Sequence, residues 1–251
     1  FVAGTESPFY ETDVEIDLSL SLNQFGYPIT GINIKSSPMI ADLDGNSYSE
    51  IYFGGEDDKL HGYMIAGMTQ YGFPFECGGN VRSSPAGGDV DGDGENEIVF
   101  GSHDGNLYIL STTGIQELAY TQAGYIVGAP ALFDLDGDED LEIIFTTQNG
   151  SNGKVYAIHH DGNDVDGFPA DISEKMLVGA AVGDLEGDGS PDIVVVTWED
   201  HIYAFNADGT TKAGFPFLAS NRFNSPATLV DLDDDGDLEI VAGNDDGDLY
   251  I

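Results

Sequence analysis

Basic side chains are scarce in this sequence. Lysine and arginine together account for 7 of its 251 residues, against 46 aspartates and glutamates, so the formal net charge is −39. Nucleic acids and anionic membrane surfaces are bound mainly through lysine and arginine. The charge balance therefore excludes nucleic acid as a partner and favours cations or cationic proteins.

Cysteine and long apolar segments are also in short supply. Cys77 is the single cysteine, so the chain has no internal disulfide, and a small buried hydrophobic role is expected for it. No apolar run approaches the ~18 residues that a membrane-spanning helix needs. This absence predicts a chain that does not insert into a membrane.

Motifs for catalysis are missing too. The sequence has no nucleophile motif and no phosphate-binding loop, which predicts that the protein is not an enzyme. The single tryptophan, Trp198, could stack on a sugar together with Tyr203, although packing is the commoner role of a lone tryptophan. None of the histidines has a metal-ligating partner at a suitable spacing, so all are expected to be turn residues: His61, His103, His159, His160 and His201.

The sequence does contain an acidic ten-residue segment that occurs five times. In chain order the copies read DLDGNSYSEI (42–51), DVDGDGENEI (89–98), DLDGDEDLEI (134–143), DLEGDGSPDI (184–193) and DLDDDGDLEI (231–240). Their first aspartates are 47, 45, 50 and 47 residues apart. A repeat of this length predicts supersecondary units that are stacked or arranged radially.

Each repeat also holds about four short apolar runs, such as IVFGS (98–102) and IIFTT (143–147), separated by Gly, Asp and Asn turns. Runs of this kind predict strands joined by hairpins, and no segment has the apolar period of a helix. Four short strands in a unit of about 40 to 50 residues are typical of a β-propeller blade. We therefore expect an all-β, five-bladed β-propeller of four-stranded blades, formed as one domain by residues 14–251 after an N-terminal extension, 1–13.

A strand near the N-terminus is expected to close the propeller. The last repeat stops within a blade, and residues 13–28 align with the outer part of a blade. Five apolar residues alternate along this segment: Val14, Ile16, Leu18, Leu20 and Leu22. Such a strand could complete its own ring in cis, or add to the sheet edge of a neighbouring molecule in trans.

The acidic segments have the composition of cation-binding loops. Numbering each from its first aspartate, carboxylates recur at positions 1, 3 and 9, position 5 carries Asp or Asn, and position 7 can add a backbone carbonyl. A hard cation that accepts six to eight oxygen ligands is calcium, whereas zinc prefers His or Cys. The candidate metal ligands are Asp42, Asp44, Asn46, Tyr48 and Glu50; Asp89, Asp91, Asp93, Glu95 and Glu97; Asp134, Asp136, Asp138, Asp140 and Glu142; Asp184, Glu186, Asp188, Ser190 and Asp192; and Asp231, Asp233, Asp235, Asp237 and Glu239.

Acidic surface turns and EF-hands are the two alternatives to calcium loops of this kind. Acidic surface turns are common, but five in register with carboxylates at the same three positions are not expected by chance. An EF-hand needs a bidentate glutamate at position 12 and flanking helices, whereas position 12 is apolar in every copy and a strand is predicted to follow. Glycine at position 4 or position 6 fits a backbone that turns tightly around an ion. About five calcium ions are thus expected, one per repeat.

The spacing of these loops resembles the calcium loops of FG-GAP/VCBS-type repeats, found in integrin alpha-subunit heads and in many secreted bacterial proteins. The resemblance extends over residues 14–251 and implies a calcium-binding β-propeller on an extracellular, secreted or cell-surface protein. The first loop departs from the pattern, because Asn46 replaces a carboxylate and Ser47 replaces a glycine. We therefore expect it to bind calcium most weakly.

The leading prediction for function is a non-enzymatic, extracellular, calcium-stabilised propeller that acts in adhesion or assembly with a protein partner. Two alternatives stay open at this point. The first is a subunit of an extracellular filament joined by exchange of the N-terminal strand. The second is a carbohydrate-binding module of a secreted enzyme, with a glycan as the partner.

Overall fold

The structure, a computed structural model, describes residues 25–251. This part of the chain contains strands and no helix, and the strands form five separate antiparallel sheets. Nothing in the described residues is therefore a helix that could span a membrane. The all-β prediction is confirmed.

Four of the sheets have four strands and the fifth has three, and every sheet follows the order of the chain. The first three sheets comprise β1 (Met39–Ala41), β2 (Glu50–Gly54), β3 (Lys59–Met64) and β4 (Phe75–Glu76); β5 (Ala86–Gly88), β6 (Glu97–Gly101), β7 (Asn106–Ser111) and β8 (Gln116–Thr121); and β9 (Ala131–Phe133), β10 (Glu142–Thr147), β11 (Lys154–Ile158) and β12 (Ala170–Asp171). The last two comprise β13 (Ala181–Gly183), β14 (Asp192–Val196), β15 (His201–Asn206) and β16 (Phe217–Leu218); and β17 (Thr228–Val230), β18 (Glu239–Gly243) and β19 (Leu249–Tyr250).

The apolar runs of the sequence form the middle strands of each sheet. In the second sheet every residue of β6 is buried, and it pairs with β7 through a hairpin that turns at Gly105, whose φ is +90°. A strand covered on both faces reads as a continuous apolar run rather than as an alternating one. The same arrangement recurs in β10 and β14, whose residues are all buried.

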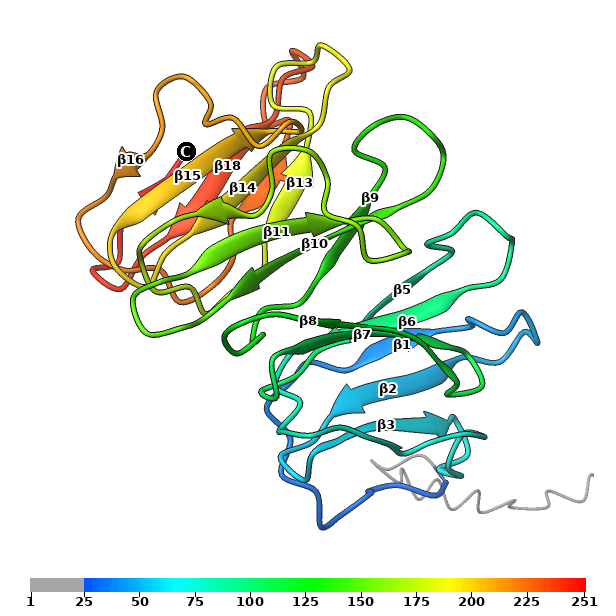
Figure 1. Ribbon diagram of the computed structural model, residues 1–251. Coiled ribbons are helices and arrows are strands. Elements are labelled where there is room, and N and C mark those ends of the chain that lie inside the picture. Colours follow the sequence, from blue (N-terminus) through cyan, green and yellow to red (C-terminus); the bar gives the residue numbers. More distant parts are fainter. Residues whose placement is uncertain (1–24) are drawn as a thin grey trace, which may run out of the picture.

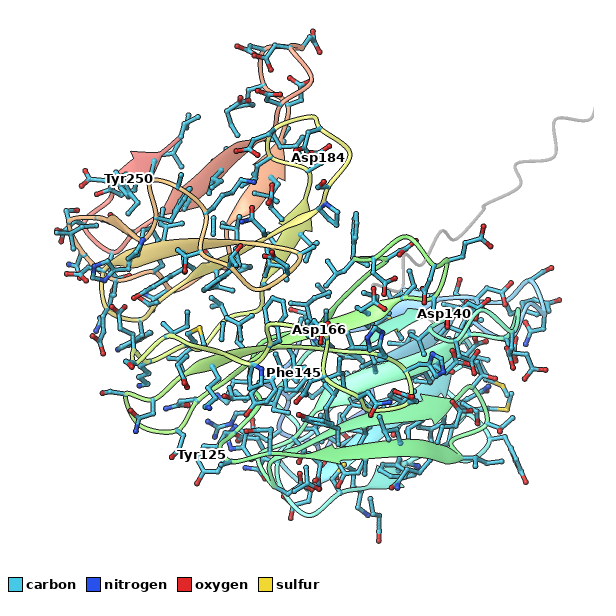
Figure 2. All side chains as sticks on the ribbon, turned by 45° about the horizontal axis from the view of Figure 1, so that its top comes forward. Tyr125, Asp140, Phe145, Asp166, Asp184 and Tyr250 are labelled. Carbon is cyan, nitrogen blue, oxygen red and sulfur yellow. The ribbon has the colours of Figure 1, made fainter. Side chains whose placement is uncertain are left out.

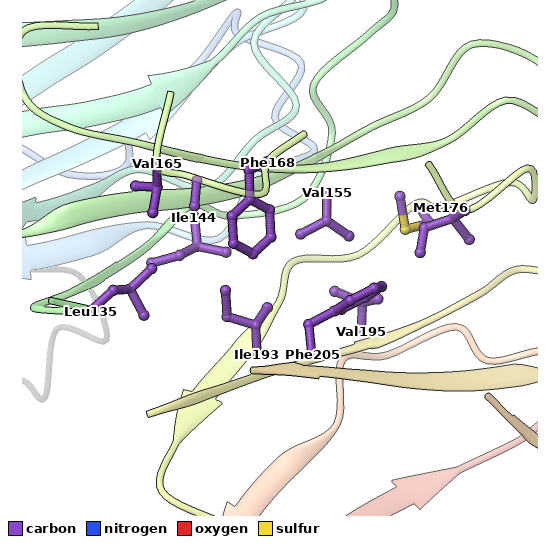
Figure 3. Close-up of a cluster of buried hydrophobic side chains, with 11 residues drawn as sticks. Leu135, Ile144, Val155, Val165, Phe168, Met176, Ile193, Val195 and Phe205 are labelled. Atoms are coloured by element: carbon purple, nitrogen blue, oxygen red, sulfur yellow. The ribbon is translucent and has the colours of Figure 1, made fainter. Parts of the chain in front are cut away.

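Hydrophobic side chains between consecutive sheets hold the sheets together. Four clusters of buried residues join the first sheet to the second, the second to the third, the third to the fourth and the fourth to the fifth. Figure 3 shows the cluster between the third and fourth sheets, where Ile144, Val155 and Phe168 face Ile193 and Phe205. The first strands of neighbouring sheets lie side by side, and the sheets follow one another from the blue end of the chain to the red end (Figure 1).

The two end sheets do not share such a core in the part of the chain that the structure describes. The residues at position 2 of the acidic loops show this, because in the first four loops this residue packs into the cluster shared with the next sheet. Leu43, Val90 and Leu135 are buried there, but Leu232 of the fifth repeat is 54% exposed. The N-terminal strand predicted for ring closure lies outside the described residues, so closure in cis or in trans stays a prediction.

Two aromatic-proline pairs, Phe73-Pro74 and Phe168-Pro169, follow glycines that pack closely against the next sheet. Gly72, before Phe73-Pro74, faces the third-to-fourth strand turn of the second sheet, and a Cβ there would lie 1.8 Å from the carbonyl oxygen of Thr113. Gly167 meets Asp208 in the same way across the third and fourth sheets. These contacts explain why a glycine precedes the pair at both places.

Candidate metal centres

The five acidic segments form loops between the first and second strand of each sheet. Backbone and side-chain hydrogen bonds join neighbouring loops: Asn96 Nδ2 donates to Leu43 O (2.9 Å), and the Leu141 amide donates to the carbonyl of Val90 (3.2 Å). Asp140 and Asp184 mark the third and fourth loops in Figure 2. The structure therefore gathers loops that are far apart in sequence into a chain of adjacent acidic turns.

The aspartate at position 1 closes each loop. One of its carboxylate oxygens accepts a hydrogen bond from the backbone N–H of position 6, at 2.6 to 3.3 Å in all five copies. Positions 4 and 6 both have positive φ in every loop, whether or not they are glycine. The non-glycine residues at these positions are Ser47, Glu139 and Asp234, with φ of +71°, +80° and +62°. The prediction that tight turns occupy these positions is confirmed.

Glu139→Gly is expected to stabilise the protein by about 1 kcal/mol, because a Cβ in the left-handed region costs about 1–2 kcal/mol and glycine's extra chain entropy offsets part of the gain. The measurement is urea unfolding in calcium. Glu139→Ala is the matched control, since it removes the same charge and keeps the Cβ. Equal stabilisation by both variants would show that charge, and not backbone conformation, limits this loop.

Position 5 supports the second half of each loop. Its side-chain oxygen accepts a hydrogen bond from the backbone N–H of position 7 at 2.8 to 3.1 Å, including the amide oxygen of Asn46 in the first loop. Residues at position 7 are thus placed by their own amides: Tyr48, Glu95, Asp140, Ser190 and Asp237. A role for their carbonyl oxygens as ligands stays a prediction.

The carboxylate at position 9 begins the second strand and is the buried member of the set. One oxygen accepts a hydrogen bond from the backbone N–H of position 2 at 2.6 to 3.4 Å in all five loops. Glu50, Glu97, Glu142 and Asp192 are at most 3% exposed. Burying a charged carboxylate is costly unless a cation or several hydrogen-bond donors compensate it.

The predicted ligands converge in space. Ligand oxygens lie within 4.8 Å of one another in three sets, which are Asp42, Asp44 and Glu50; Asp89, Asp91 and Glu97; and Asp134, Asp136 and Asp138. In addition, Oδ1 of Asp89 and Oδ1 of Asp231 are buried and have no hydrogen-bond partner. An oxygen-only donor set with buried, unpartnered oxygens fits a hard divalent cation such as calcium.

The electrostatics of the loops indicate the same need for positive charge. Burial, chiefly, and the charges of Glu117, Asp91 and Asp89 together raise the pKa of Glu97 to about 7, although the hydrogen bond from Val90 lowers it. Burial likewise raises the pKa of Glu50 and of Glu142. In the exposed fifth loop the pKa of Asp233 is raised chiefly by the neighbouring charge of Asp235. These carboxylates are harder to ionise together than in water.

Two side chains near the loops were not found from the sequence. His159 Nδ1 lies 3.0 Å from Glu142 Oε1, and Lys212 Nζ lies 2.6 Å from Asp192 Oδ1. Each lies in the segment that follows the third strand of its sheet and contacts the carboxylate at position 9 from there. The register offers a signal for His159: because Ile143 pairs with Ile158, Glu142 and His159 follow as neighbours across the two strands. No such pairing predicts Lys212.

The expectation that all histidines are unpartnered turn residues is wrong. His61 lies within β3 and bonds Asp57 at 3.0 Å, and His201 begins β15. His201 Nδ1 is 2.8 Å from Glu174 Oε1. Asp57 is a local partner, in the turn four residues before His61, whereas Glu174 is distant in sequence and reaches His201 only in the folded sheet.

Trp198 and Cys77 have packing roles. Lys175 Nζ lies 4.9 Å and Arg222 Cζ 4.5 Å from the centroid of the Trp198 ring, so cations already contact the surface that a sugar would need. Cys77 packs against the core between the first and second sheets, and burial raises the pKa of its thiol to about 12. A thiol with a raised pKa is unreactive.

Comparison with known proteins supports the repeat assignment. The family model described as FG-GAP-like repeat matches residues 134–195 and 184–242, which include the third, fourth and fifth loops. A search of the curated proteins finds no match.

Solved structures with similar folds are distant in sequence. The V. cholerae biofilm matrix protein Bap1 is 19% identical with a TM-score of 0.61, over 86% of this chain and 39% of that one. The Pseudomonas aeruginosa PilY1 C-terminal domain is 14% identical with a TM-score of 0.61, over 79% of this chain and 52% of that one. BamB from Moraxella catarrhalis is 15% identical with a TM-score of 0.57, over 86% of this chain and 60% of that one.

This chain thus spans less than two thirds of the length of each of these three proteins, and at such identities the likeness concerns the fold alone. Its sheets of four antiparallel strands, its acidic loops and the family match agree with one another. Residues 134–242 carry FG-GAP-like repeats, and the described part of the chain has the fold of a repeat β-propeller.

Proposed function

We propose that the acidic loops hold calcium ions and that these ions stabilise an extracellular, non-enzymatic repeat domain. The observation that carries this proposal is the convergence of Asp89, Asp91 and Glu97, with the buried and unpartnered Oδ1 of Asp89 among their oxygens. Carboxylates held this close repel one another, and a divalent ion among them turns the repulsion into attraction. The same scaffold of hydrogen bonds recurs in every loop, which supports one binding mode for the family of loops.

The role that best fits this domain is adhesion or assembly. Two proteins of similar fold are described as a biofilm matrix protein and as PilY1, which gives the proposal its direction. A formal charge of −39 favours cations and cationic protein surfaces as partners. Calcium at millimolar concentration, which weak sites need, is found outside cells. No enzymatic step is proposed.

Self-association is the first test. In about 1 mM calcium we expect one of two results: sedimentation velocity shows concentration-dependent assembly, or the chain binds to an immobilised protein surface. In excess EGTA we expect neither. A chain that stays monomeric and binds no protein surface under both conditions would contradict a role in adhesion or assembly.

Two truncations and one substitution separate the alternatives. Removal of residues 1–22 abolishes assembly if the alternating N-terminal segment joins neighbouring molecules, whereas removal of 1–12 keeps that segment and serves as the control. Glycan binding that is lost in Trp198→Ala would instead favour a carbohydrate-binding module. The cations on the Trp198 ring do not favour that outcome.

A further inference from the structure

We propose that the ammonium group of Lys212 takes the place of a metal ion in the fourth loop, so that this loop is folded without calcium. The inference rests on the proposed function, because it concerns which of the acidic loops binds the ion. It assigns to the fourth loop the side chain of a lysine as its cation.

The contacts of Lys212 are those of a cation inside a ligand set. Its Nζ lies 2.6 Å from Asp192 Oδ1 and 2.9 Å from Glu186 Oε2, and its side chain is 10% exposed. Glu186 and Asp192 occupy positions 3 and 9, two of the four positions whose side chains supply metal ligands. The ammonium therefore bridges residues that a bound ion would bridge.

Both oxygens of Asp192 are already engaged. Oδ1 accepts the hydrogen bond from Lys212, and Oδ2 accepts one from the backbone N–H of Leu185 at 3.0 Å. In the second loop, by contrast, the hydrogen bond from Val90 engages only Oε2 of Glu97. An ion entering the fourth loop must displace the ammonium or bind beside a positive charge at contact distance, and both weaken binding.

The same place in other sheets carries no charge. Lys212, Val165 and Gln70 are equivalent, because each backbone N–H donates to a carbonyl of the third strand: to Ala204 (2.8 Å), Ala157 (2.9 Å) and Gly62 (2.8 Å). Val165 and Gln70 are buried there. Each of the three residues lies two positions before the glycine of a Gly-aromatic-Pro sequence. The first, third and fourth sheets thus share this position, and in the fourth repeat a lysine fills it.

Counting ions tests the inference. After equilibrium dialysis in calcium, we expect Asp184→Asn to bind as many ions per chain as the parent, and Asp89→Asn to bind one fewer. Lys212→Gln, which copies the residue of the first sheet, is expected to gain one ion. The converse substitution, Gln70→Lys, is expected to lose one from the first loop.

The outcomes separate the two proposals. Loss of one ion in Asp184→Asn, with no gain in Lys212→Gln, overturns the role of Lys212 and leaves calcium binding intact. If the parent protein binds no calcium and the Asp89→Asn variant binds none either, both the proposed function and this inference are overturned. The Asp184 and Asp89 variants keep the test decisive if Lys212→Gln fails to fold.

Discussion

Excess EGTA is expected to lower the melting temperature of this protein by at least about 10 °C relative to about 1 mM calcium. A ligand at a thousandfold excess over its Kd stabilises the folded state by about 4 kcal/mol per site. For a chain of this size, 1 kcal/mol corresponds to about 2–4 °C. Because this value corresponds to a single site and several loops are expected to bind calcium, it is a lower bound. Differential scanning calorimetry measures the shift.

Magnesium provides the control for this experiment. It prefers a strict octahedron and keeps its waters, so it should restore little of the lost stability, whereas calcium added back to the chelated protein should restore all of it. A melting temperature that EGTA leaves unchanged would mean that the folded loops tolerate their own charge. This result would contradict the proposal that calcium stabilises the fold of this protein.

Glu97→Gln is expected to change stability in opposite directions with and without calcium. Without the ion, the folded-state pKa of Glu97 is about 7, above its ordinary value, so the folded state binds the proton more tightly than the unfolded one. Stability then falls as pH rises toward 7, and above it the full penalty of an ionised, buried carboxylate is present. At about pH 8 in EGTA, the neutral amide should stabilise the protein by roughly 1–3 kcal/mol.

In calcium the same substitution removes a ligand from the second loop. The variant should then be less stable than the parent by roughly 2–4 kcal/mol, the contribution of one occupied site. Glu199→Gln is the control, because Glu199 is exposed and lies outside the loops; it should change neither measurement. Chemical unfolding of the three proteins at about pH 5 and pH 8 gives the comparison, and a Glu97→Gln effect of one sign in all conditions would contradict the account.

The regular parts of the fold follow from local sequence. The run IVFGS forms most of β6 and the start of the turn after it, as expected, because a strand that is buried on both faces consists of consecutive apolar residues. The loop geometry was predictable for a similar reason: Gly94 and Gly189 mark the left-handed position, and the aspartate at position 1 reaches the amide there. The non-glycine exceptions, such as Glu139, could be placed only by alignment with the other repeats.

The parts that the sequence did not predict depend on contacts between distant segments. Lys212 meets Asp192 from 20 residues away, and His159 meets Glu142 from 17. Hairpin register and sheet curvature set these contacts, and no short spacing encodes either one. Ring closure stays a prediction, because the segment on which that prediction is based lies outside the described residues.

The five loops share one pattern of hydrogen bonds but differ in the side chain that contacts position 9. Position 1 bonds position 6 and position 9 bonds position 2 in every copy, so the backbone shape is the same throughout. What varies is the side chain that contacts position 9, which is a histidine in the third loop and a lysine in the fourth. One of the chain's 7 lysine and arginine residues, Lys212, thus contacts an acidic loop at its buried carboxylate.

An anomalous difference map of crystals grown in calcium would test the central claim most directly. We predict a peak in the second loop with oxygens of Asp89, Asp91, Asp93 and Glu97 at about 2.3–2.6 Å, as calcium coordination requires. Well-ordered loops around empty density, in crystals saturated with calcium, would contradict it.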